Sequence, residues 1–367
     1  MCVERTLPDW QSPASNRGSN AVPHGEVLIP KASTTANEQQ GHYVLCLSQF
    51  VSWLGGIAEE MEGELCPWFA GCITGRKVVR AVRTNEVGLD RQDRMKESFE
   101  PGMEFLARVT LLAEGAHGPL TKTAVRAFDL RRNSEPQTYG MGAKEVWRVR
   151  PEKHQPGLVQ HTLGWPLDFR TYGGTFCYHM DGGLVSLGLV VGLDYANPYL
   201  SPYRELQRLK HHPLFRDLLE GGERIAYGGR TLNEGGIQSL PKLYFPGGAL
   251  VGCAAGTLNV PKIKGTHNAM KSGMIAAESA FGVLGDMEGK EVGEAVADMS
   301  GYEKSLKESW VWKELVEVRN IRPSFNTPLG LWGGIAYSGV DSLFLKGRVP
   351  WTFKHGRSDA AHTKRAR

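Results

Sequence analysis

Hydrophobic and polar positions along this 367-residue chain predict short strands and helices in alternation, with glycine-rich turns between them. The apolar run at 249–251 predicts a buried strand, and the alanine-rich stretch at 270–281 predicts a helix that faces a sheet. Residues 302–320 gather Trp310 and Leu315 on one helical face, which predicts an amphipathic helix. The pattern is therefore typical of an α/β protein.

The same pattern divides the chain into parts. Two stretches that alternate strands, glycine turns and helices predict one α/β domain, and a stretch of short β-rich segments with proline turns predicts a second domain inserted into it. Polar or basic ends predict disorder and flexibility. The predicted parts are 41–147 with 223–300 (the α/β domain), 148–222 (the insert), 301–353 (the amphipathic helix and an apolar segment), 1–40 (disordered) and 354–367 (a flexible basic tail).

Composition and charge mainly exclude functions. The net charge is +4, and no basic cluster with interleaved aromatic residues occurs, so we expect no nucleic acid partner. None of the six cysteines stands in a Cys-x-x-Cys pair, so the spacing predicts neither an iron–sulfur nor a zinc site. His211 and His212 lack acidic or cysteine neighbours at metal spacing, which favours a solvated or packing role. No order of Ser, His and Asp indicates a hydrolase, and we assign no catalytic side chain.

Neither a targeting peptide nor a membrane span is visible in the sequence. Residues 1–20 contain acidic residues, lack an apolar core of signal-peptide length, and are not arginine-rich as a mitochondrial presequence would be. No run of about 18 apolar residues occurs. Single, scattered cysteines are typical of a reducing compartment.

The most informative motif runs from Gly252 to Gly273. It connects the strand predicted at 249–251 to the helix behind it, and its loop contains Gly256 and Gly265. Glycines let the main chain approach a flat or anionic ligand closely, and the start of the helix presents partly positive amides to such a ligand. On spacing alone, an ordinary glycine-rich turn is favoured over a cofactor site by roughly two to one.

Resemblance to a known family changes that balance. The order Pro261-Lys-Ile-Lys-Gly-Thr-His267 resembles the second flavin-contacting segment of the electron transfer flavoprotein-ubiquinone oxidoreductase family, which usually has phenylalanine where Thr257 stands here. Geranylgeranyl reductases share the general plan but lack this dense agreement. Further words typical of the family recur in the same order: Glu135-Pro-Gln-Thr-Tyr-Gly, Gly164-Trp-Pro-Leu-Asp, Tyr172-Gly-Gly, Asn197-Pro-Tyr-Leu-Ser-Pro, Leu232-Asn-Glu-Gly-Gly and Ser309-Trp-Val-Trp-Lys-Glu-Leu.

The resemblance implies an α/β fold with an α+β insert: a partial FAD-binding Rossmann-like domain of the glutathione-reductase type and an inserted β-rich quinone (substrate) domain. It implies a flavoprotein oxidoreductase of respiratory electron transport that accepts electrons from reduced electron transfer flavoprotein and reduces ubiquinone to ubiquinol. The FAD-binding positions carried over from the family are Ala113, Glu114, Gly115, Gly252, Gly256, Asn259, Val260, Pro261, Gly265, Thr266 and His267.

The quinone-binding positions implied by the resemblance are Tyr172, Gly173 and Gly174. In the family the paired glycines hydrogen-bond a carbonyl of the ubiquinone ring through the main chain. A fixed backbone N–H stabilises the negative charge that gathers on this oxygen during reduction. Without the resemblance, a glycine pair that only serves a turn at a strand end would be favoured by about four to one.

The apolar segment 328–345 is the predicted membrane contact. Alone it would be read as a core-facing helix hairpin by about three to one, but the corresponding family segment dips into one leaflet of the mitochondrial inner membrane at its matrix face, or of a bacterial inner membrane. Asp341 departs from the apolar pattern and predicts a shallower insertion. The membrane-facing candidates are Leu329, Leu331, Trp332, Ile335, Tyr337, Leu343, Phe344 and Leu345.

Two features of the family have no counterpart in the sequence. No Gly-x-Gly-x-x-Gly follows a strand, so we expect the unit that holds the adenosine half of FAD to be missing. The cysteine ligands of the family's 4Fe-4S cluster are also missing. We therefore expect the middle of a larger enzyme. The alternative is an inactive, truncated paralogue or fragment that binds membrane, quinone or a partner without turnover.

Overall fold

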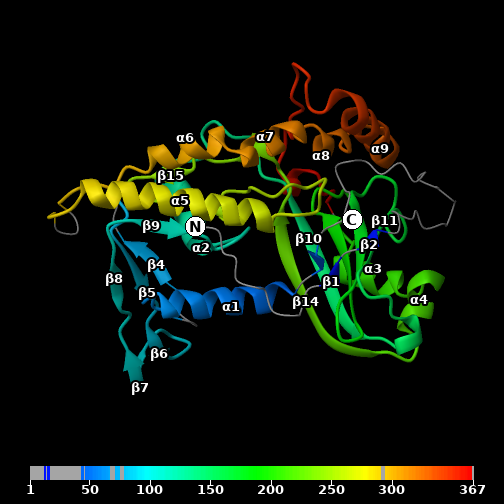
Figure 1. The fold of residues 1–367 in the computed structure, drawn as a ribbon, viewed down its shortest axis with the longest axis horizontal. Helices are drawn as coiled ribbons and strands as arrows, with labels where there is room; N and C mark the ends of the chain where they lie inside the picture. Colours follow the sequence, from blue (N-terminus) through cyan, green and yellow to red (C-terminus); the bar gives the residue numbers. More distant parts are fainter. Residues whose placement is uncertain are drawn as a thin grey trace.

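The computed structural model describes residues 12–13, 15–16, 43–44, 46–66, 71–74, 78–290 and 294–365, with side chains in 46–66, 78–290 and 294–365. A large sheet stands at one end of the molecule, small sheets lie at the other, and helices run along the upper side between them (Figure 1).

Strands and helices alternate along the described chain, as the sequence pattern predicts. The strands are β1 (Ser12–Pro13), β2 (Ser15–Asn16), β3 (Tyr43–Val44), β4 (Gly71–Thr74), β5 (Ala81–Thr84), β6 (Val87–Leu89), β7 (Met95–Glu100), β8 (Glu104–Leu106), β9 (Thr110–Leu112), β10 (Tyr139–Arg148), β11 (Leu158–Leu163), β12 (Gly173–His179), β13 (Leu184–Gly192), β14 (Glu223–Asn233), β15 (Tyr244–Phe245) and β16 (Gly248–Leu250). The α-helices are α1 (Leu47–Glu60), α2 (Pro119–Ala127), α3 (Pro202–Leu209), α4 (Pro213–Leu219), α5 (Thr266–Asp286), α6 (Ser300–Glu308), α7 (Trp310–Glu317), α8 (Ile321–Ser324) and α9 (Gly330–Val340).

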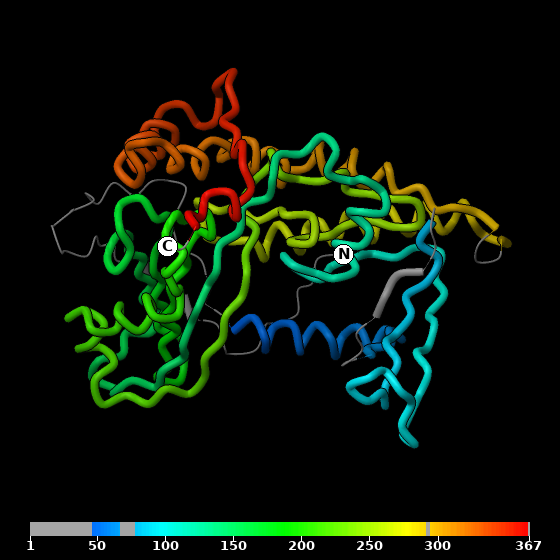
Figure 2. The backbone as a smooth tube through the Cα atoms, turned by 180° about the vertical axis from the view of Figure 1, so that it is seen from behind, coloured from blue at the N-terminus to red at the C-terminus, as the bar shows by residue number. Residues whose placement is uncertain are grey.

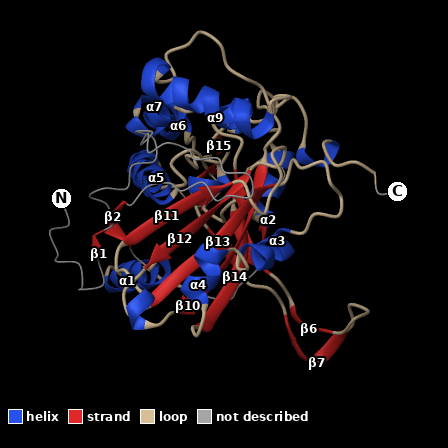
Figure 3. Cartoon of the chain, turned by 90° about the vertical axis from the view of Figure 1, so that its right-hand side faces the viewer, coloured by secondary structure: helices blue, strands red, loops and turns tan. Residues whose placement is uncertain are grey.

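The large sheet has the strand order β14-β10-β13-β12-β11-β2, and all its pairs are antiparallel except β11 with β2. Helices α3 and α4 cover one face of it (Figure 3). Along β12 buried and half-buried residues alternate, because side chains point to opposite faces and only one face packs against these helices. Leu187, Leu189, Leu206 and Phe215 lie in the resulting core.

A second hydrophobic core lies in the part of the molecule outside the large sheet. Strand β16 pairs parallel to β9 and antiparallel to β15, and α2, α5, α6 and α7 contribute side chains that pack with this small sheet. The buried strand and the long helix predicted on either side of the glycine motif are therefore present, as β16 and α5. Tyr302 is fully buried here and donates to the carbonyl oxygen of Leu250 at 3.0 Å.

The domain boundaries differ from those expected from the sequence. Strands β10 and β14 belong to the same sheet as β11–β13, so the inserted unit spans 139–233 rather than 148–222. Residues 223–230 of β14 are exposed on both faces, so the strand carries no alternation of apolar and polar positions that would mark it in the sequence. Residues 71–74 and 78–106 contain two small antiparallel sheets, β4-β5-β8 and the β6–β7 hairpin.

Two other expectations are corrected. The helix predicted over 302–320 is broken into α6 and α7 at Ser309, whose backbone is extended and whose hydroxyl donates to the Leu306 carbonyl at 2.7 Å. The tail expected to be flexible is held along the large sheet (Figure 2): His355 is buried, Asp359 accepts from the Tyr139 amide at 2.8 Å, and the Lys364 amide donates to the Ala196 carbonyl at 3.0 Å.

The disorder predicted for residues 1–40 falls outside the described residues except at β1 and β2. There, β1 pairs with β3 and β2 pairs with β11.

Candidate functional site

The two predicted cofactor segments meet at the carboxyl ends of the parallel strands β9 and β16. Ala249 lies opposite Leu111, and the Val251 amide donates to the Leu112 carbonyl at 2.9 Å. Carboxyl ends of adjacent parallel strands are where α/β sheets bind ligands. The pairing thus brings Ala113 and Gly252, which are far apart in sequence, to one edge of the sheet.

The loop after β16 has the backbone conformation that glycine allows. Gly252 has a φ of +60° and Gly256 a φ of +100°, and the Gly256 amide donates to the Gly252 carbonyl at 3.1 Å. The loop then closes on itself, because Asn259 and Lys264 exchange two backbone hydrogen bonds at 3.1 and 3.2 Å.

Helix α5 begins at this loop with unsatisfied amides. Gly265 precedes the helix, no side chain of the described chain caps it, and its first turn holds no acidic residue. Its free N–H groups and partial positive charge suit an anionic or carbonyl-bearing ligand. Close by, Gln137 Nε2 and Thr257 Oγ1 are buried without a partner among the described residues, and a Cβ at Gly256 would lie 3.0 Å from Gln137 Nε2. These observations fit a flat, polar cofactor contacted through main-chain groups.

Three of the predicted cofactor side chains have other partners. Glu114 accepts from the Thr121 amide at 2.6 Å and so satisfies the start of α2. Asn259 Nδ2 donates to Glu314 at 2.6 Å, and His267 Nε2 lies 3.0 Å from the same carboxylate. These residues would therefore meet a cofactor through their backbone rather than through their side chains.

Glu314 on α7 is a residue that the sequence analysis did not single out. Besides Asn259 and His267 it pairs with Lys262 at 3.1 Å, while His267 stacks on Trp310. Burial disfavours the charged carboxylate, but the hydrogen bonds it accepts lower its pKa to about 2. One ionised side chain, that of Glu314, thus holds the loop Gly252–Gly265 (the glycine loop) against α7.

The predicted quinone residues lie at the start of β12. The described pairing of β12 with β13 begins at Gly173, whereas the pairing with β11 begins at Gly174. A Cβ on Gly173 would lie 2.4 Å from the Val190 carbonyl oxygen, and one on Gly174 would lie 2.7 Å from the Thr162 carbonyl oxygen. Sheet packing alone therefore requires glycine at both positions, so a strand-end role and a quinone role are compatible.

Tyr172 is held by a buried group of charges. The Arg322 guanidinium lies 4.0 Å from the centre of its ring, while Phe325 packs edge-on at 4.8 Å. Arg322 Nη2 donates to both carboxylate oxygens of Asp194 at 2.9 and 3.0 Å, and its Nε donates to Glu234 at 3.0 Å. The side chains of the two pairs are 3–7% exposed, so this is a buried ion cluster.

The buried ion cluster was not predicted from the sequence. Glu234 and Asp194 stand 88 and 128 positions before Arg322. Glu234 lies within the family-like word Leu232-Asn-Glu-Gly-Gly, but no short-range spacing links it to Asp194 or Arg322. Burial alone would lower the pKa of Arg322, yet Glu234 and Asp194 raise it above its ordinary value.

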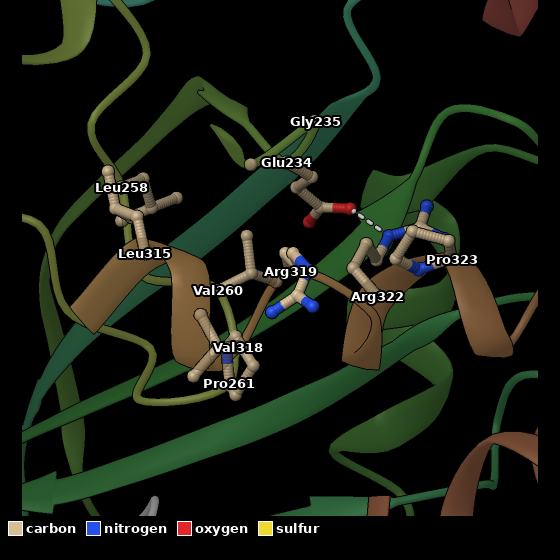
Figure 4. A pocket seen from close by; sticks show the side chains of 11 residues that line it. Glu234, Gly235, Leu258, Val260, Pro261, Leu315, Val318, Arg319, Arg322 and Pro323 are labelled. Carbon is tan, nitrogen blue, oxygen red and sulfur yellow. Dashed lines mark hydrogen bonds and ion pairs between the residues drawn. The ribbon is translucent and has the colours of Figure 1, made fainter. Parts of the chain in front are cut away.

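A small cavity adjoins both the buried ion cluster and the glycine loop (Figure 4). Its volume of about 10 Å³ is enough for one water molecule. Glu234 and Arg322 form one side, with the hydrogen bond between them visible in Figure 4, and Val260 and Pro261 of the glycine loop form another.

The predicted membrane segment exposes several of its large apolar side chains. Leu329, Trp332, Leu343 and Phe344 are 47–77% exposed, and Phe169 beside them, which the sequence did not indicate, is 48% exposed. The remaining candidates, Leu331, Ile335, Tyr337 and Leu345, are half-buried.

Asp341 lies inward rather than toward the surface of this segment. It is 1% exposed, and burial raises the pKa of its carboxyl. The sequence predicts a shallower membrane insertion because of Asp341. Since its side chain is buried inside the protein, that reason does not hold. No helix in the described part of the chain is long and apolar enough to cross a bilayer.

The described residues contain no group of three His, Cys, Asp or Glu placed to hold a metal ion. His212, one of the paired histidines, accepts from the Leu214 amide at 3.2 Å and so caps α4.

Solved structures define the class of the fold. A geranylgeranyl bacteriochlorophyll reductase-like protein from Thermoplasma acidophilum is similar to 97% of this chain and 75% of its own, with a TM-score of 0.59 and 15% identity. The flavin-dependent brominase Bmp2 matches 96% of this chain and 80% of its own, with a TM-score of 0.55 and 15% identity. The fold is therefore the mixed α/β fold of FAD-dependent oxidoreductases and halogenases.

Sequence relatives define the family. Human mitochondrial electron transfer flavoprotein-ubiquinone oxidoreductase is 53% identical over 98% of this chain and 60% of its own length, and the Bos taurus protein is 47% identical over 100% and 61%. The family model described as "ETF-QO, ubiquinone-binding" matches residues 139–232, almost the span of the large sheet. The chain belongs to the electron transfer flavoprotein-ubiquinone oxidoreductase family, and it spans about 60% of the length of these relatives.

Proposed function

We propose that this chain binds FAD at the carboxyl ends of β9 and β16 and passes electrons from reduced electron transfer flavoprotein to ubiquinone. The observation that carries the proposal is the meeting of two glycine-bearing segments beside the uncapped start of α5. The names of the relatives and the ubiquinone-binding family model support the substrates.

The proposed FAD contacts are main-chain groups of Ala113–Gly115, of the loop Gly252–Gly265 and of the first residues of α5, in a flavin domain of the glutathione-reductase type. Bound FAD would supply electron transfer, which the side chains of this chain do not provide. The loop positions the ring through glycine backbone, and Glu314 holds Asn259 and His267 in place behind it. We assign no 4Fe-4S cluster to this chain.

The proposed quinone contact is the main chain at Gly173 and Gly174, with Tyr172 beside it. At Gly173 the described sheet pairing is present on the β13 side alone, which is consistent with a backbone group that is left for a ligand. An N–H fixed by the sheet stabilises negative charge on a carbonyl oxygen without reorganising.

The proposed location is the matrix face of the mitochondrial inner membrane. The relatives are mitochondrial by name, and α9 with the turn after it exposes Trp332 and Phe344 next to Lys346 and Arg348. Apolar and aromatic side chains flanked by cations suit the headgroup boundary of a lipid surface. The alternative of an inactive fragment has no support among the relatives, whose names are those of oxidoreductases.

The first test is flavin retention. The purified chain is mixed with FAD and passed through gel filtration, and we expect flavin absorbance to elute with the protein. Thr266→Glu puts a negative charge at the first residue of α5, where it favours the helix but repels an electron-rich ligand, and it should weaken retention about tenfold or more. Ser300→Glu makes the same change at the start of α6 and should leave retention unchanged. A colourless wild-type protein would overturn the proposal.

The second test is turnover. The FAD-loaded chain is supplied with reduced electron transfer flavoprotein and a short-tailed ubiquinone, and quinol formation is followed. Flavin retention without quinol formation would overturn the proposed reduction of ubiquinone and leave only the proposed FAD binding.

A further inference from the structure

Two carboxyl groups contact a single guanidinium in the buried ion cluster, and a third acts on them through its charge. Asp194 and Glu234 pair directly with Arg322, and Asp359 from the C-terminal tail is coupled to all three through its charge. Asp359 Oδ2 accepts from the Tyr139 amide at 2.8 Å, and its Oδ1 is buried without a partner among the described residues. The described cluster thus brings together four ionisable side chains from four segments.

Full ionisation of the three carboxyl groups would leave an excess of two negative charges, one of them on the half-buried Asp359 and the other among side chains that are 3–7% exposed. Such an excess is costly, so at least one carboxyl of a coupled set keeps its proton. Burial raises the pKa of Glu234 although Arg322 favours its charged form, and burial likewise raises the pKa of Asp359.

Arg319 lines the same cavity as Glu234, but its guanidinium donates to the carbonyl oxygens of Val316, Gly347 and Val349 rather than to a carboxylate of the cluster. Two other titratable groups around the cluster are neutral. Burial raises the pKa of the Tyr172 phenol and lowers the pKa of His355, so both side chains stay neutral near pH 7. His355 instead contacts the Gly235 carbonyl at 2.7 Å. Lys354 is largely exposed and lies 3.8 Å from Glu135. The proton is therefore held by a carboxyl group.

Geometry singles out Glu234 among the three. Asp194 receives two hydrogen bonds from Arg322, which stabilise its ionised form, whereas Glu234 receives one. Glu234 lines the water-sized cavity, and Asp359 is not among the residues that line it. Glu234 thus has both a reason to keep a proton and a route for exchanging it.

The cluster also reaches both candidate sites. Across the cavity from Glu234 lie Val260 and Pro261 of the glycine loop, and on its other side Arg322 covers the ring of Tyr172, the residue before Gly173. A proton on Glu234 therefore lies between the proposed flavin segment and the proposed quinone contact.

We propose that Glu234 holds a proton at neutral pH and gives it up to the ubiquinone oxygen as the quinone is reduced. This inference rests on the proposed function. Reduction of a quinone to a quinol takes two electrons and two protons. The electrons come from the proposed reaction, one proton comes from Glu234, and the other comes from solvent. Because Arg322 lies between Glu234 and Tyr172, the proton passes through water: the O–H bond of Glu234 breaks as water in the cavity takes its proton, and that water passes a proton on to form the quinol O–H bond. Arg322 pairs with the carboxylate left behind, and solvent then returns a proton to it.

The first readout needs neither flavin nor quinone. The infrared carbonyl stretch of a protonated carboxyl group is measured on the chain at pH 7. We expect Glu234→Gln to remove one such component, whereas Asp359→Asn should keep it. Glu145→Gln is the matched control, because Glu145 is fully buried but ionised beside Lys210 at 2.8 Å. If the spectra of wild type and Glu234→Gln agree, or if only Asp359→Asn loses the component, the assignment to Glu234 is overturned.

The second readout is quinone reduction by the FAD-loaded chain. Glu234→Gln should lower kcat about 10²-fold and change the KM for quinone by less than about twofold, because a general acid acts on the chemical step rather than on binding. Glu234→Asp keeps the acid and should restore at least about a tenth of the wild-type rate. It also provides a folded comparison if the glutamine variant does not fold.

The two proposals fail differently. A wild-type chain that retains flavin but reduces no quinone overturns the proposed quinone reduction, and the delivery step with it, and leaves the proposed FAD binding. A wild-type chain that reduces quinone at the same rate as Glu234→Gln overturns the delivery step alone.

Discussion

Single side chains set the geometry of the candidate cofactor loop. Asn259 and His267 were predicted as cofactor contacts because they stand in the family motif, yet both bind Glu314. Their side chains instead hold the loop against α7 through Glu314. A motif thus identifies residues that matter without telling whether the side chain or the backbone meets the ligand.

Replacing Glu314 should show how much its contacts with the loop stabilise the folded chain. Glu314→Gln removes the charge that pairs with Lys262 and His267, and we expect it to lower the free energy of unfolding at pH 7 by about 1–3 kcal/mol. The folded-state pKa of about 2 lies below the ordinary value of 4.5, so this stabilisation is complete above about pH 4.5 and is lost as the pH falls toward 2. Urea unfolding at pH 7 and pH 3 should show a smaller gap between variant and wild type at the lower pH. Glu308→Gln, at an exposed position of α6, is the control, and an equal loss there would contradict the expectation.

At the scale of elements, α9 shows why an apolar segment can look ambiguous in sequence. Two of its glycines, Gly330 and Gly334, are buried, and a Cβ on Gly334 would lie 2.2 Å from the ring of Phe325. The large side chains that remain, Trp332 and then Phe344 in the following turn, are 50% and 77% exposed. The helix therefore packs closely through glycine and leaves an apolar surface outside.

That surface should bind lipid. We expect the wild-type chain to sediment with vesicles of phosphatidylcholine and phosphatidylglycerol, and the double variant Trp332→Ser, Phe344→Ser to bind about tenfold or more weakly, because each side chain contributes roughly 1.5–3 kcal/mol on leaving water. Phe281→Ser is the control, since Phe281 is 82% exposed on α5. An equal loss of vesicle binding in the control variant would indicate non-specific hydrophobic binding rather than a membrane-binding face.

At the scale of the whole molecule, the C-terminal tail joins parts that are distant in sequence. Asp359 binds Tyr139 at the start of β10, and His355 binds Gly235 just after β14. Both contacts lie at the end of the large sheet next to the buried ion cluster. The tail is therefore held against the end of the large sheet by contacts with both of these strand ends.

Removal of the tail should destabilise the chain. We expect truncation after Phe353 to lower the free energy of unfolding by roughly 2–4 kcal/mol, the sum expected for about three hydrogen bonds made by partly buried groups. Truncation after Lys364 keeps these bonds and should cost nothing measurable. Urea unfolding followed by circular dichroism gives both values, and a tail that can be removed without effect would restore the expectation of flexibility.

The sequence by itself determined the family, the apolar segment 328–345, and a strand, glycine loop and helix, with the strand predicted at 249–251 and present at 248–250, and the helix predicted at 270–281 and present at 266–286. These are local signals: the apolar period identifies an element, and rare words in a fixed order identify a lineage. The motifs also identify the residues that are adjacent to Gly252 and Gly173 in the sequence.

Tertiary structure alone decided what joins distant residues. The extent of the large sheet depends on exposed β14, whose residues carry no alternation, so only pairing with β10 reveals it. Arg322 meets Asp194 and Glu234 across 128 and 88 positions, and the basic tail folds back onto the sheet. Charges are costly to bury singly, so they are placed by the fold that brings their partners together, and no short stretch of sequence records that meeting.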